Sequence, residues 1–471
     1  MPAGRSTSTG PSTSAEALRK AVAWSIMCTT MRSSRSADPT KPPADAAKAL
    51  ETAPATAVAP LDLSGFPDWL VEQGLSGVSL EELVDGFCRR LVGAGFPARR
   101  FNMIIGTLHP RHGARSYIWR PTGLETEAFS RRRSEDESAA YLRSPIYYLR
   151  RSGEPRLRRR LDTGEPMQFQ LLEELRDAGM TEYAARIVRF GGVDTASLKR
   201  GLTVVRNAQF DPLQGVFFSC ATDVPGGFDD FQLQQVADAL PPLALAVKSR
   251  TTFDVARTLL ETYLGEDAGR HVLTGEIDRH SVQRIRAVIW LCDLRGYSSV
   301  ANRVGQEDLV EILDAYLEAM ARPVLDNKGQ ILKFMGDGFL ATFDLAERDS
   351  EAVCVDALKA AGELLDYFPR FNAERRAAAK PTLDFGVGLH LGEVLYGNIG
   401  ASDRLDFTVV GSAVNEASRI EGMCRPLQRK VLVSSSFHDA AGTNGNRMTS
   451  LGFHALRGIR EPRELFTIAG G

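Results

Sequence analysis

Apolar residues over 281–471 recur at spacings that alternate between those of strands and those of helices. A short continuous apolar run is typical of a buried strand, and positions three and four apart indicate an amphipathic helix. The expected order is strand, helix, two strands joined by a tight turn, helix, strand, then a strand, a glycine break and a helix, at 286–292, 309–320, 329–341, 350–367, 383–391 and 404–420.

Residues 61–225 mix helical and strand-like patterns. Ser79 and Glu82 form the S-x-x-E pattern of a helix capping box, and apolar residues at helical spacing follow them. Gly93 and Gly95 are expected to end this helix. The strand-like segments are 101–108, 116–119, 202–205 and 215–221. The mixture predicts an α+β regulatory or sensor domain over 61–225.

Residues 226–280 are expected to form a helical signalling linker, with Asp229 or Asp230 as the N-cap. We expect Pro241 and Pro242 to kink or interrupt the helix, because proline lacks the amide hydrogen. A long apolar stripe between two domains is a common way to join dimeric halves. The alternative is a helix that packs within one domain.

Residues 1–60 are rich in Ser, Thr, Ala and Pro and are expected to form a disordered N-terminal tail. Arg19 and Lys20 precede a short apolar run, which faintly resembles a targeting segment. The run is short and no convincing cleavage site follows it. We therefore favour a loose tail, or an upstream start codon, over targeting.

Composition narrows the class of protein. The length of 471 residues favours about three domains or fewer. A net charge of -2 excludes a globally basic nucleic-acid binder. No apolar run approaches the roughly 18 residues that a membrane span needs, so we expect a soluble, cytoplasmic protein. The six cysteines form no CxxC pair, which argues against zinc and for buried, reduced thiols.

Arginine is concentrated between residues 131 and 160. One interpretation is a site for an anionic ligand or partner. The other, which we favour, is a solvated face balanced by nearby Glu and Asp. Nothing in residues 61–225 indicates catalysis.

Two aspartates are the first candidates for chemistry. Asp293 ends the first expected strand and is followed by glycine and hydroxyl residues, where a carboxylate can hold a cation while backbone amides face phosphates. The turn 335–338 places Asp337 at a hairpin tip, from which it could join Asp293 around one or two Mg²⁺ ions. A plain turn aspartate is the alternative for Asp337. Asn415 and Arg419 are four residues apart and so share a helix face.

Together these segments, over about 285–470, resemble the catalytic domain of class III nucleotide cyclases. The resemblance implies a ferredoxin-like βαββαβ core with extra strands, and a homodimer with active sites at its interface. It also implies two Mg²⁺ or Mn²⁺ ions per active site, held at Asp293, Leu294 and Asp337.

The resemblance also assigns the substrate-binding residues. Lys333 matches the lysine that reads the purine, and Thr408 stands where many members have Asp. Asn415 matches the ribose-orienting asparagine, and Arg419 the arginine that stabilises charge in the transition state. A Lys/Thr pair donates to adenine N1 and accepts from the 6-amino group, which implies ATP as substrate. A subgroup with Thr at this position includes bicarbonate-responsive cyclases.

Other contacts with the substrate follow less directly from the resemblance. Gly296 and Tyr297 are expected beside the triphosphate. Arg457 or Arg460 is expected to clamp it, in place of the lysine-rich tail of other members. Glu393 stands where some mammalian domains place a basic residue.

The implied reaction is attack of the ribose 3′-hydroxyl on the α-phosphate, which gives 3′,5′-cyclic AMP and pyrophosphate. One ion would lower the pKa of that hydroxyl, and the other would neutralise the β- and γ-phosphates. No protein general base is evident.

Residues 61–225 resemble the GAF-like sensor domains placed ahead of cyclases, which implies a small-molecule ligand there. Two alternatives remain: an inactive nucleotide-binding homologue, or a regulatory scaffold that recruits partners through its arginines.

Overall fold

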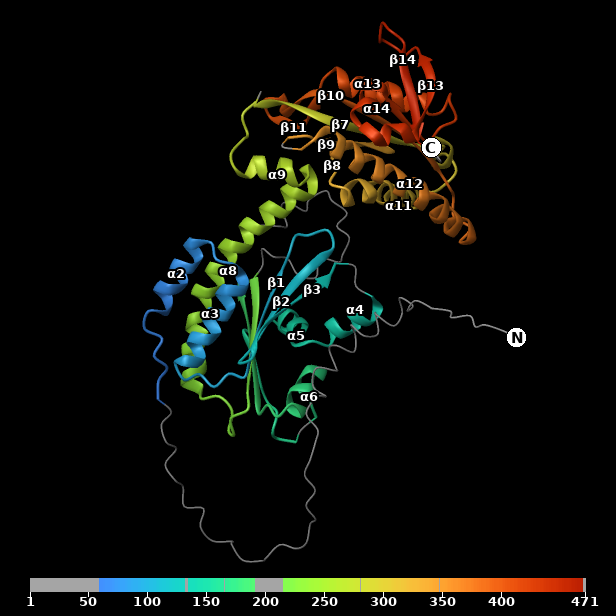
Figure 1. The fold of residues 1–471 in the computed structure, drawn as a ribbon. Helices are drawn as coiled ribbons and strands as arrows, with labels where there is room; N and C mark the ends of the chain where they lie inside the picture. The colour runs from blue at the N-terminus through green and yellow to red at the C-terminus, as the bar shows by residue number, and fades with distance from the viewer. Residues whose placement is uncertain are drawn as a thin grey trace, which may run out of the picture. The chain divides into compact units, whose positions relative to one another are not determined.

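A computed structural model describes residues 59–131, 134–164, 166–190, 215–279, 281–346 and 348–468. The chain divides into two compact units, Met1–Ala256 and Arg257–Gly471 (Figure 1). The expected tail, apart from its last two residues, and the expected strand at 202–205 lie outside the described residues. Among the helices of the described ranges, none has the length and apolar character needed to cross a bilayer.

The first unit is built on a six-stranded antiparallel sheet in the order β3-β2-β1-β6-β5-β4. Its strands are β1 (Arg100–Gly106), β2 (His112–Arg120), β3 (Gly123–Ser130), β4 (Arg156–Arg160), β5 (Glu182–Arg189) and β6 (Gly215–Thr222). The helices of the unit are α2 (Phe66–Ser76), α3 (Leu80–Gly93), α4 (Glu135–Leu142), α5 (Pro145–Ser152), α6 (Gln170–Asp177) and the first part of α8 (Asp230–Leu264).

Helices cover both faces of this sheet. Along β1, Met103 faces a core shared with α2, α3 and α8, whereas Ile104 faces a core shared with α5 and α6. Successive side chains of a strand point to opposite faces, so a single strand serves both cores. Figure 1 shows the two sets of helices on the two sides of the sheet. The α+β expectation for this region is therefore confirmed.

The capping box predicted for α3 is present. The Ser79 hydroxyl accepts from the Glu82 amide, and the Glu82 carboxylate accepts from the Ser79 amide at 3.0 Å. Three strands of this unit escaped prediction: β3, β4 and β5. Of these, β3 and β4 are the two edges of the sheet, and β4 reads RLRRR. Edge strands face water and carry charge, which hides their period-two pattern.

Pro241 and Pro242 do not interrupt the helix, because α8 continues through both residues. Proline removes an amide hydrogen bond, but the surrounding side chains compensate for that loss. Leu240, Leu243 and Val247 are buried in the core shared with α2 and α3. Gly265, at φ 91°, separates α8 from α9 (Glu266–Leu273), so the region expected as one linker contains two helices.

The second unit contains a mixed eight-stranded sheet in the order β13-β14-β12-β10-β7-β9-β8, with β11 paired to β10. Its elements are β7 (Val282–Arg295), α10 (Tyr297–Ala301), α11 (Gln306–Asp326), β8 (Gln330–Met335), β9 (Gly338–Asp344), α12 (Ser350–Ala377), β10 (Asp384–Ala401), β11 (Arg404–Val410), α13 (Ser412–Met423), β12 (Val431–Ser434), α14 (Ser435–Ala440), a 3₁₀ helix (Gly442–Arg447), β13 (Met448–His454) and β14 (Arg463–Ile468).

The elements β7, α11, β8, β9, α12 and β10 form the expected ferredoxin-like βαββαβ core. Their strands lie in the order β10-β7-β9-β8, and each neighbouring pair is antiparallel. Each of the two crossover helices connects two strands that are not neighbours in the sheet, as in a split βαβ arrangement. The remaining strands extend the sheet beyond β10.

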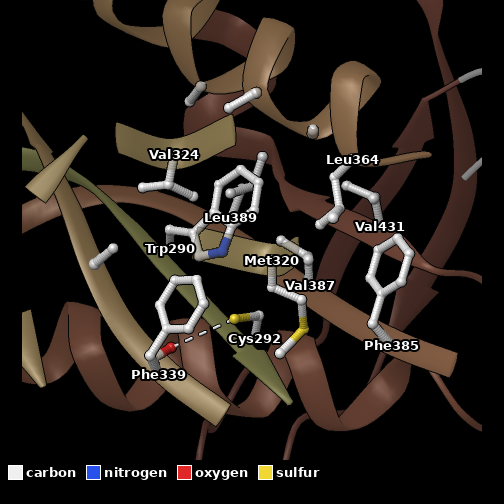
Figure 2. Close-up of a cluster of buried hydrophobic side chains, with 14 of the residues drawn as sticks. Trp290, Cys292, Met320, Val324, Phe339, Leu364, Phe385, Val387, Leu389 and Val431 are labelled. Carbon is white, nitrogen blue, oxygen red and sulfur yellow. Dashed lines mark hydrogen bonds between the residues drawn. The ribbon is translucent and has the colours of Figure 1, made fainter. Parts of the chain in front are cut away.

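Strand β7 divides the two cores of this unit. Trp290 and Cys292 lie with Met320 and Val324 of α11 and Leu364 of α12 on one face (Figure 2). Ala287 and Ile289 face the opposite core, which includes side chains from α9 and α13. The five cysteines in the described ranges are buried and form no disulfide, as expected; Cys28 lies outside those ranges.

Helix α13 lies directly on the backbone of β10. A Cβ atom at Gly388 would be 2.6 Å from the Glu421 amide nitrogen and 2.7 Å from the Ala417 carbonyl oxygen. Glycine is therefore required by close approach rather than by a turn. This contact sets the distance between the helix and the sheet.

Gly388→Ala should push α13 away from β10 and destabilise the second unit by about 1–3 kcal/mol, as overpacking does. Calorimetric unfolding of the full chain measures the effect. Gly422→Ala is the matched control, because Gly422 lies in α13 and no neighbouring atom lies within 4 Å of its added Cβ. An equal loss of stability in both variants would contradict the close-packing argument.

Candidate functional site

Asp293 and Asp337 meet where β7 and β9 run side by side. Asp293 lies opposite Gly338, the first residue of β9, in the antiparallel register. Gly336, at φ 67°, makes the turn between β8 and β9, and the Leu294 amide donates to the Asp337 carbonyl at 3.2 Å. A side chain at Gly338 would collide with the Cys292 carbonyl and lie 2.9 Å from Asp293 Oδ1. Glycine there lets the two carboxylates come together.

The pair is electrostatically unfavourable without a cation. Burial, the charge of Asp337 and a hydrogen bond with Asp337 raise the pKa of Asp293 to about 6. Like charges at one site disfavour ionisation of both groups. The arrangement is what a cation-binding pair of carboxylates requires, because a bound cation would remove the repulsion.

A third carboxylate, Glu421 of α13, lies close to this pair and was missed from the sequence. Burial, followed by the negative charge of Asp293, raises the pKa of Glu421 to about 7, while Arg295 opposes the shift. Glu421 Oε1 occupies the space where a side chain at Gly386 would be, 2.6 Å from its Cβ position. In the described ranges, no three His, Cys, Asp or Glu side chains are grouped closely enough to hold a metal ion.

The residues after Asp293 offer backbone groups rather than side chains. The Leu294 side chain is buried in the core, so only its main chain could contact a ligand. Gly296, at φ 86°, precedes the five-residue helix α10. Tyr297 is partly buried and packs against the core of the unit.

Lys333 of β8 forms an ion pair with Asp406 of β11, with Lys333 Nζ 2.6 Å from Asp406 Oδ2. This hydrogen bond lowers the pKa of Asp406. Thr408 lies two residues further along β11, on the same face as Asp406, because Phe407 and Val409 between and beside them are buried. Sequence reasoning singled out Thr408 and missed Asp406, the residue of this face that pairs with Lys333.

Asn415 and Arg419 share the exposed face of α13, as predicted. Ala413, Ala417 and Ile420 form the buried face of the same helix. In the described residues no hydrogen bond or ion pair joins Asn415 or Arg419 to Asp293 or Asp337. Their side chains are exposed and available to a ligand or to another chain.

Arg457 and Arg460 are exposed in the connection between β13 and β14. Across the described part of the chain, neither guanidinium forms an ion pair. Glu393 forms an exposed ion pair with Arg284 at 3.2 Å.

The arginines between 131 and 160 mostly hold the first unit together. Arg158 binds Glu182, Asp230 and the Phe228 carbonyl. Arg160 binds Asp162, Arg150 binds the Tyr141 hydroxyl, and Arg131 binds the carbonyls of Thr107 and His109. These contacts support the structural interpretation of the arginine-rich segment; Arg132 and Arg133 lie outside the described residues.

Comparisons with known proteins place the second unit in a family. Residues 281–470 match the family described as the adenylate and guanylate cyclase catalytic domain. An adenylate cyclase of Anabaena cylindrica is 35% identical over 155 residues, which are 32% of this chain and 30% of that protein. Adenylate cyclase 1 of Rhizobium meliloti is 29% identical over 166 residues, which are 35% of this chain and 24% of that protein.

A solved structure, that of the guanylyl cyclase Cya2, is 29% identical, with a TM-score of 0.36 over 40% of this chain and 94% of the other. The chain spans less than a third of the length of the two curated relatives above. The similarity thus concerns one domain. Residues 281–470 of this chain are a class III adenylate/guanylate cyclase catalytic domain.

Proposed function

We propose that the chain is an adenylate cyclase, which converts ATP to 3′,5′-cyclic AMP and pyrophosphate at sites shared by two copies of the chain. The observation that carries the proposal is the Asp293–Asp337 pair at the junction of β7 and β9. It lies in the same domain as a base-reading lysine held by a carboxylate. The names of the two curated relatives support adenylate rather than guanylate chemistry.

The acidic pair fits divalent cations. Mg²⁺ typically takes one or two carboxylates and completes its coordination with water and substrate phosphates. Asp293 and Asp337 would supply the carboxylates, and the main chain of Leu294 a further oxygen. When bound, the ions would polarise the phosphates and lower the pKa of the ribose 3′-hydroxyl.

The remaining residues bind and orient the substrate. Lys333 donates to adenine N1, and Thr408 accepts from the 6-amino group. Asp406 holds the Lys333 ammonium in place through their 2.6 Å contact. Asn415 orients the ribose, and the fixed positive charge of Arg419 stabilises the negative charge that develops at the reacting phosphate.

The triphosphate requires further contacts. The backbone amides at Gly296 and Tyr297, which closely follow Asp293 in the chain, are candidates to bind the phosphates. The Tyr297 side chain is not a candidate, because it packs against the core. Arg457 and Arg460 are candidates for the basic clamp, because both are exposed cations that form no ion pair with a described residue.

Exposed apolar side chains support a dimer. Phe334 and Met335 are exposed on β8, directly after Lys333. Leu395 and Val410 face each other across β10 and β11 and are also exposed. Covering such residues with a second copy removes apolar surface from water beside the base-reading residues. A twofold dimer would create two equivalent sites.

A sensor function of the first unit remains a prediction from the sequence. The two cores of its sheet are complete within the unit, so the unit can fold as a regulatory module. The expected GAF-like ligand and signal are part of this proposal and rest on the position of the unit ahead of the catalytic domain.

Removal of the acidic repulsion should stabilise the chain in the absence of divalent cations. Asp293 has a pKa of about 6 when folded, against an ordinary value of 3.8. The folded state therefore binds more protons between these values, and the ionised group destabilises the fold above pH 6. Asp293→Asn should raise stability at pH 8 by about 1 kcal/mol, after allowing for screening of a half-buried pair. The gain should shrink towards pH 4.

Thermal unfolding with and without Mn²⁺ completes that test. Mn²⁺ should raise the melting temperature of the wild type but not that of Asp293→Asn, which should also lose cyclase activity. Asp314→Asn, an exposed position on α11, is the control and should respond to Mn²⁺ as the wild type does. Equal stabilisation of Asp293→Asn by Mn²⁺ would refute the metal assignment.

Purified wild-type protein with Mn²⁺ should convert ATP in preference to GTP. Lys333→Glu combined with Thr408→Cys reverses the hydrogen-bonding pattern at the base and should lower ATP selectivity at least tenfold, because unpaired buried polar groups cost roughly 1–3 kcal/mol. The ratio of kcat/KM values for ATP and GTP measures this. Lys359→Glu on α12 is the control and should leave the ratio unchanged; an unchanged ratio in the double variant would show that these residues do not read the base.

Mixing two inactive variants tests the shared site. Asp293→Ala and Arg419→Ala should each inactivate both sites of a homodimer. In a mixed dimer both lesions fall in one site, and the other site is intact. Random mixing gives about half heterodimers with one working site each, so activity should return to about a quarter of the wild-type value. No recovery, with subunit exchange confirmed, would disprove the shared arrangement.

A further inference from the structure

A polar network connects α13 to the sheet through Glu416. Glu416 of α13 accepts a hydrogen bond from Arg463 Nε of β14 at 3.1 Å. Glu416 Oε1 is also 4.0 Å from His390 Nδ1 of β10. His390 Nδ1 lies 3.0 Å from the hydroxyl of Ser434, at the end of β12. The network joins α13 to three strands of the sheet.

His390 and Glu416 are largely enclosed, whereas the Arg463 side chain is 38% exposed. The His390 side chain is 8% exposed and that of Glu416 16% exposed. The backbone of Gly392 packs closely against α13 and the His390 ring, because a Cβ atom there would lie 2.6 Å from Ala413 Cβ and 3.0 Å from His390 Nε2. A buried carboxylate needs charged or hydrogen-bonding partners to remain ionised, so these contacts are energetically important.

The serine, histidine and glutamate do not form a nucleophilic site. Ser434 is 1% exposed, and its hydroxyl accepts from the Phe437 amide as the N-cap of α14. The Ser436 hydroxyl donates to the Leu391 carbonyl at 2.9 Å. Both hydroxyls are therefore committed to holding backbone, and a substrate has no access to Ser434.

Arg463 is the main counter-charge of Glu416 at neutral pH. Burial holds the pKa of His390 below its usual value, with Glu416 opposing this effect and Arg463 reinforcing it. The only charged groups that face His390 among the described residues are therefore Glu416 and Arg463. Glu461 also approaches Arg463, at 3.9 Å, but is largely exposed.

We propose that Glu416 is a positioning residue, and that its ion pair with Arg463 against His390 fixes α13 so that Asn415 and Arg419 are correctly placed. Glu416 immediately follows Asn415 and lies three residues, less than one helical turn, before Arg419. A shift of α13 would therefore move both active-face residues together. The catalytic consequence rests on the proposed cyclase function, whereas the placement of α13 does not.

Hydrogen exchange of the α13 peptide tests the placement without any need for activity. In the full-length chain, Glu416→Gln should speed exchange in α13 by about tenfold, because it removes the charge on one side of a charge-assisted hydrogen bond. Exchange in α11 should be unchanged. Glu461→Gln is the matched control, because it alters a second glutamate near the same arginine. Unchanged exchange of α13 in Glu416→Gln would overturn the proposal.

Kinetics test the catalytic consequence. Glu416→Gln should lower kcat at least tenfold while KM for ATP changes less than twofold, because Arg419 acts mainly in the transition state. Arg463→Lys should retain more activity than Arg463→Gln. In an Arg419→Lys background, which keeps the positive charge but changes the geometry of the donor, Glu416→Gln should cause little further loss, since the two residues act as a unit. A full additional tenfold loss in that background would refute action through Arg419, and lack of activity in the wild type would refute the cyclase proposal alone.

Discussion

Close backbone contact between α13, β10, β7 and β9 is the constraint on which the site depends. Gly338 and Gly386 remove the side chains that would separate these elements, so Asp293 meets Asp337, and Glu421 lies near enough for its charge to interact with theirs. Carboxylates in such a place destabilise the fold unless a cation or a proton is present. Stability is thus lost at the site and recovered in the two apolar cores on either side of β7.

Much of the catalytic domain could be predicted because its elements have strong periodicity. The stripes of α11 and α12, the hairpin between β8 and β9, and the exposed pair on α13 all follow from local patterns. The strands that escaped prediction lack a clear apolar pattern of their own and depend on contacts with neighbouring elements. β4 is almost entirely arginine and pairs with β5 because Arg158 finds Glu182 and Asp230 as partners. Likewise, α8 continues through two prolines because its neighbours bury Leu240 and Leu243.

The site residues that were missed share one property: each acts through a partner far away in the sequence. Asp406 meets Lys333 across 73 positions, and Glu416 meets Arg463 across 47. The Glu421 carboxylate occupies space that Gly386 leaves open, 35 positions earlier in the chain. Local spacing identifies which residues share a face, but only the tertiary register shows which faces meet.

The distribution of polar groups explains why one copy of the domain is insufficient for the proposed reaction. The acidic pair lies at the β7–β9 junction, whereas Asn415 and Arg419 project from α13 without a contact to that pair among the described residues. The charges of Lys333 and Asp406 neutralise each other, so a charged ligand group is not needed beside them. The hydrogen-bonding groups that the ion pair leaves unused would suit the edge of a neutral purine. The triphosphate, in contrast, needs cations at the acidic pair and a positive charge from elsewhere. In the proposed dimer, a twofold partner would supply that charge to both sites at once. Under this proposal assembly would control catalysis, because neither half of the charge distribution would stabilise the transition state alone.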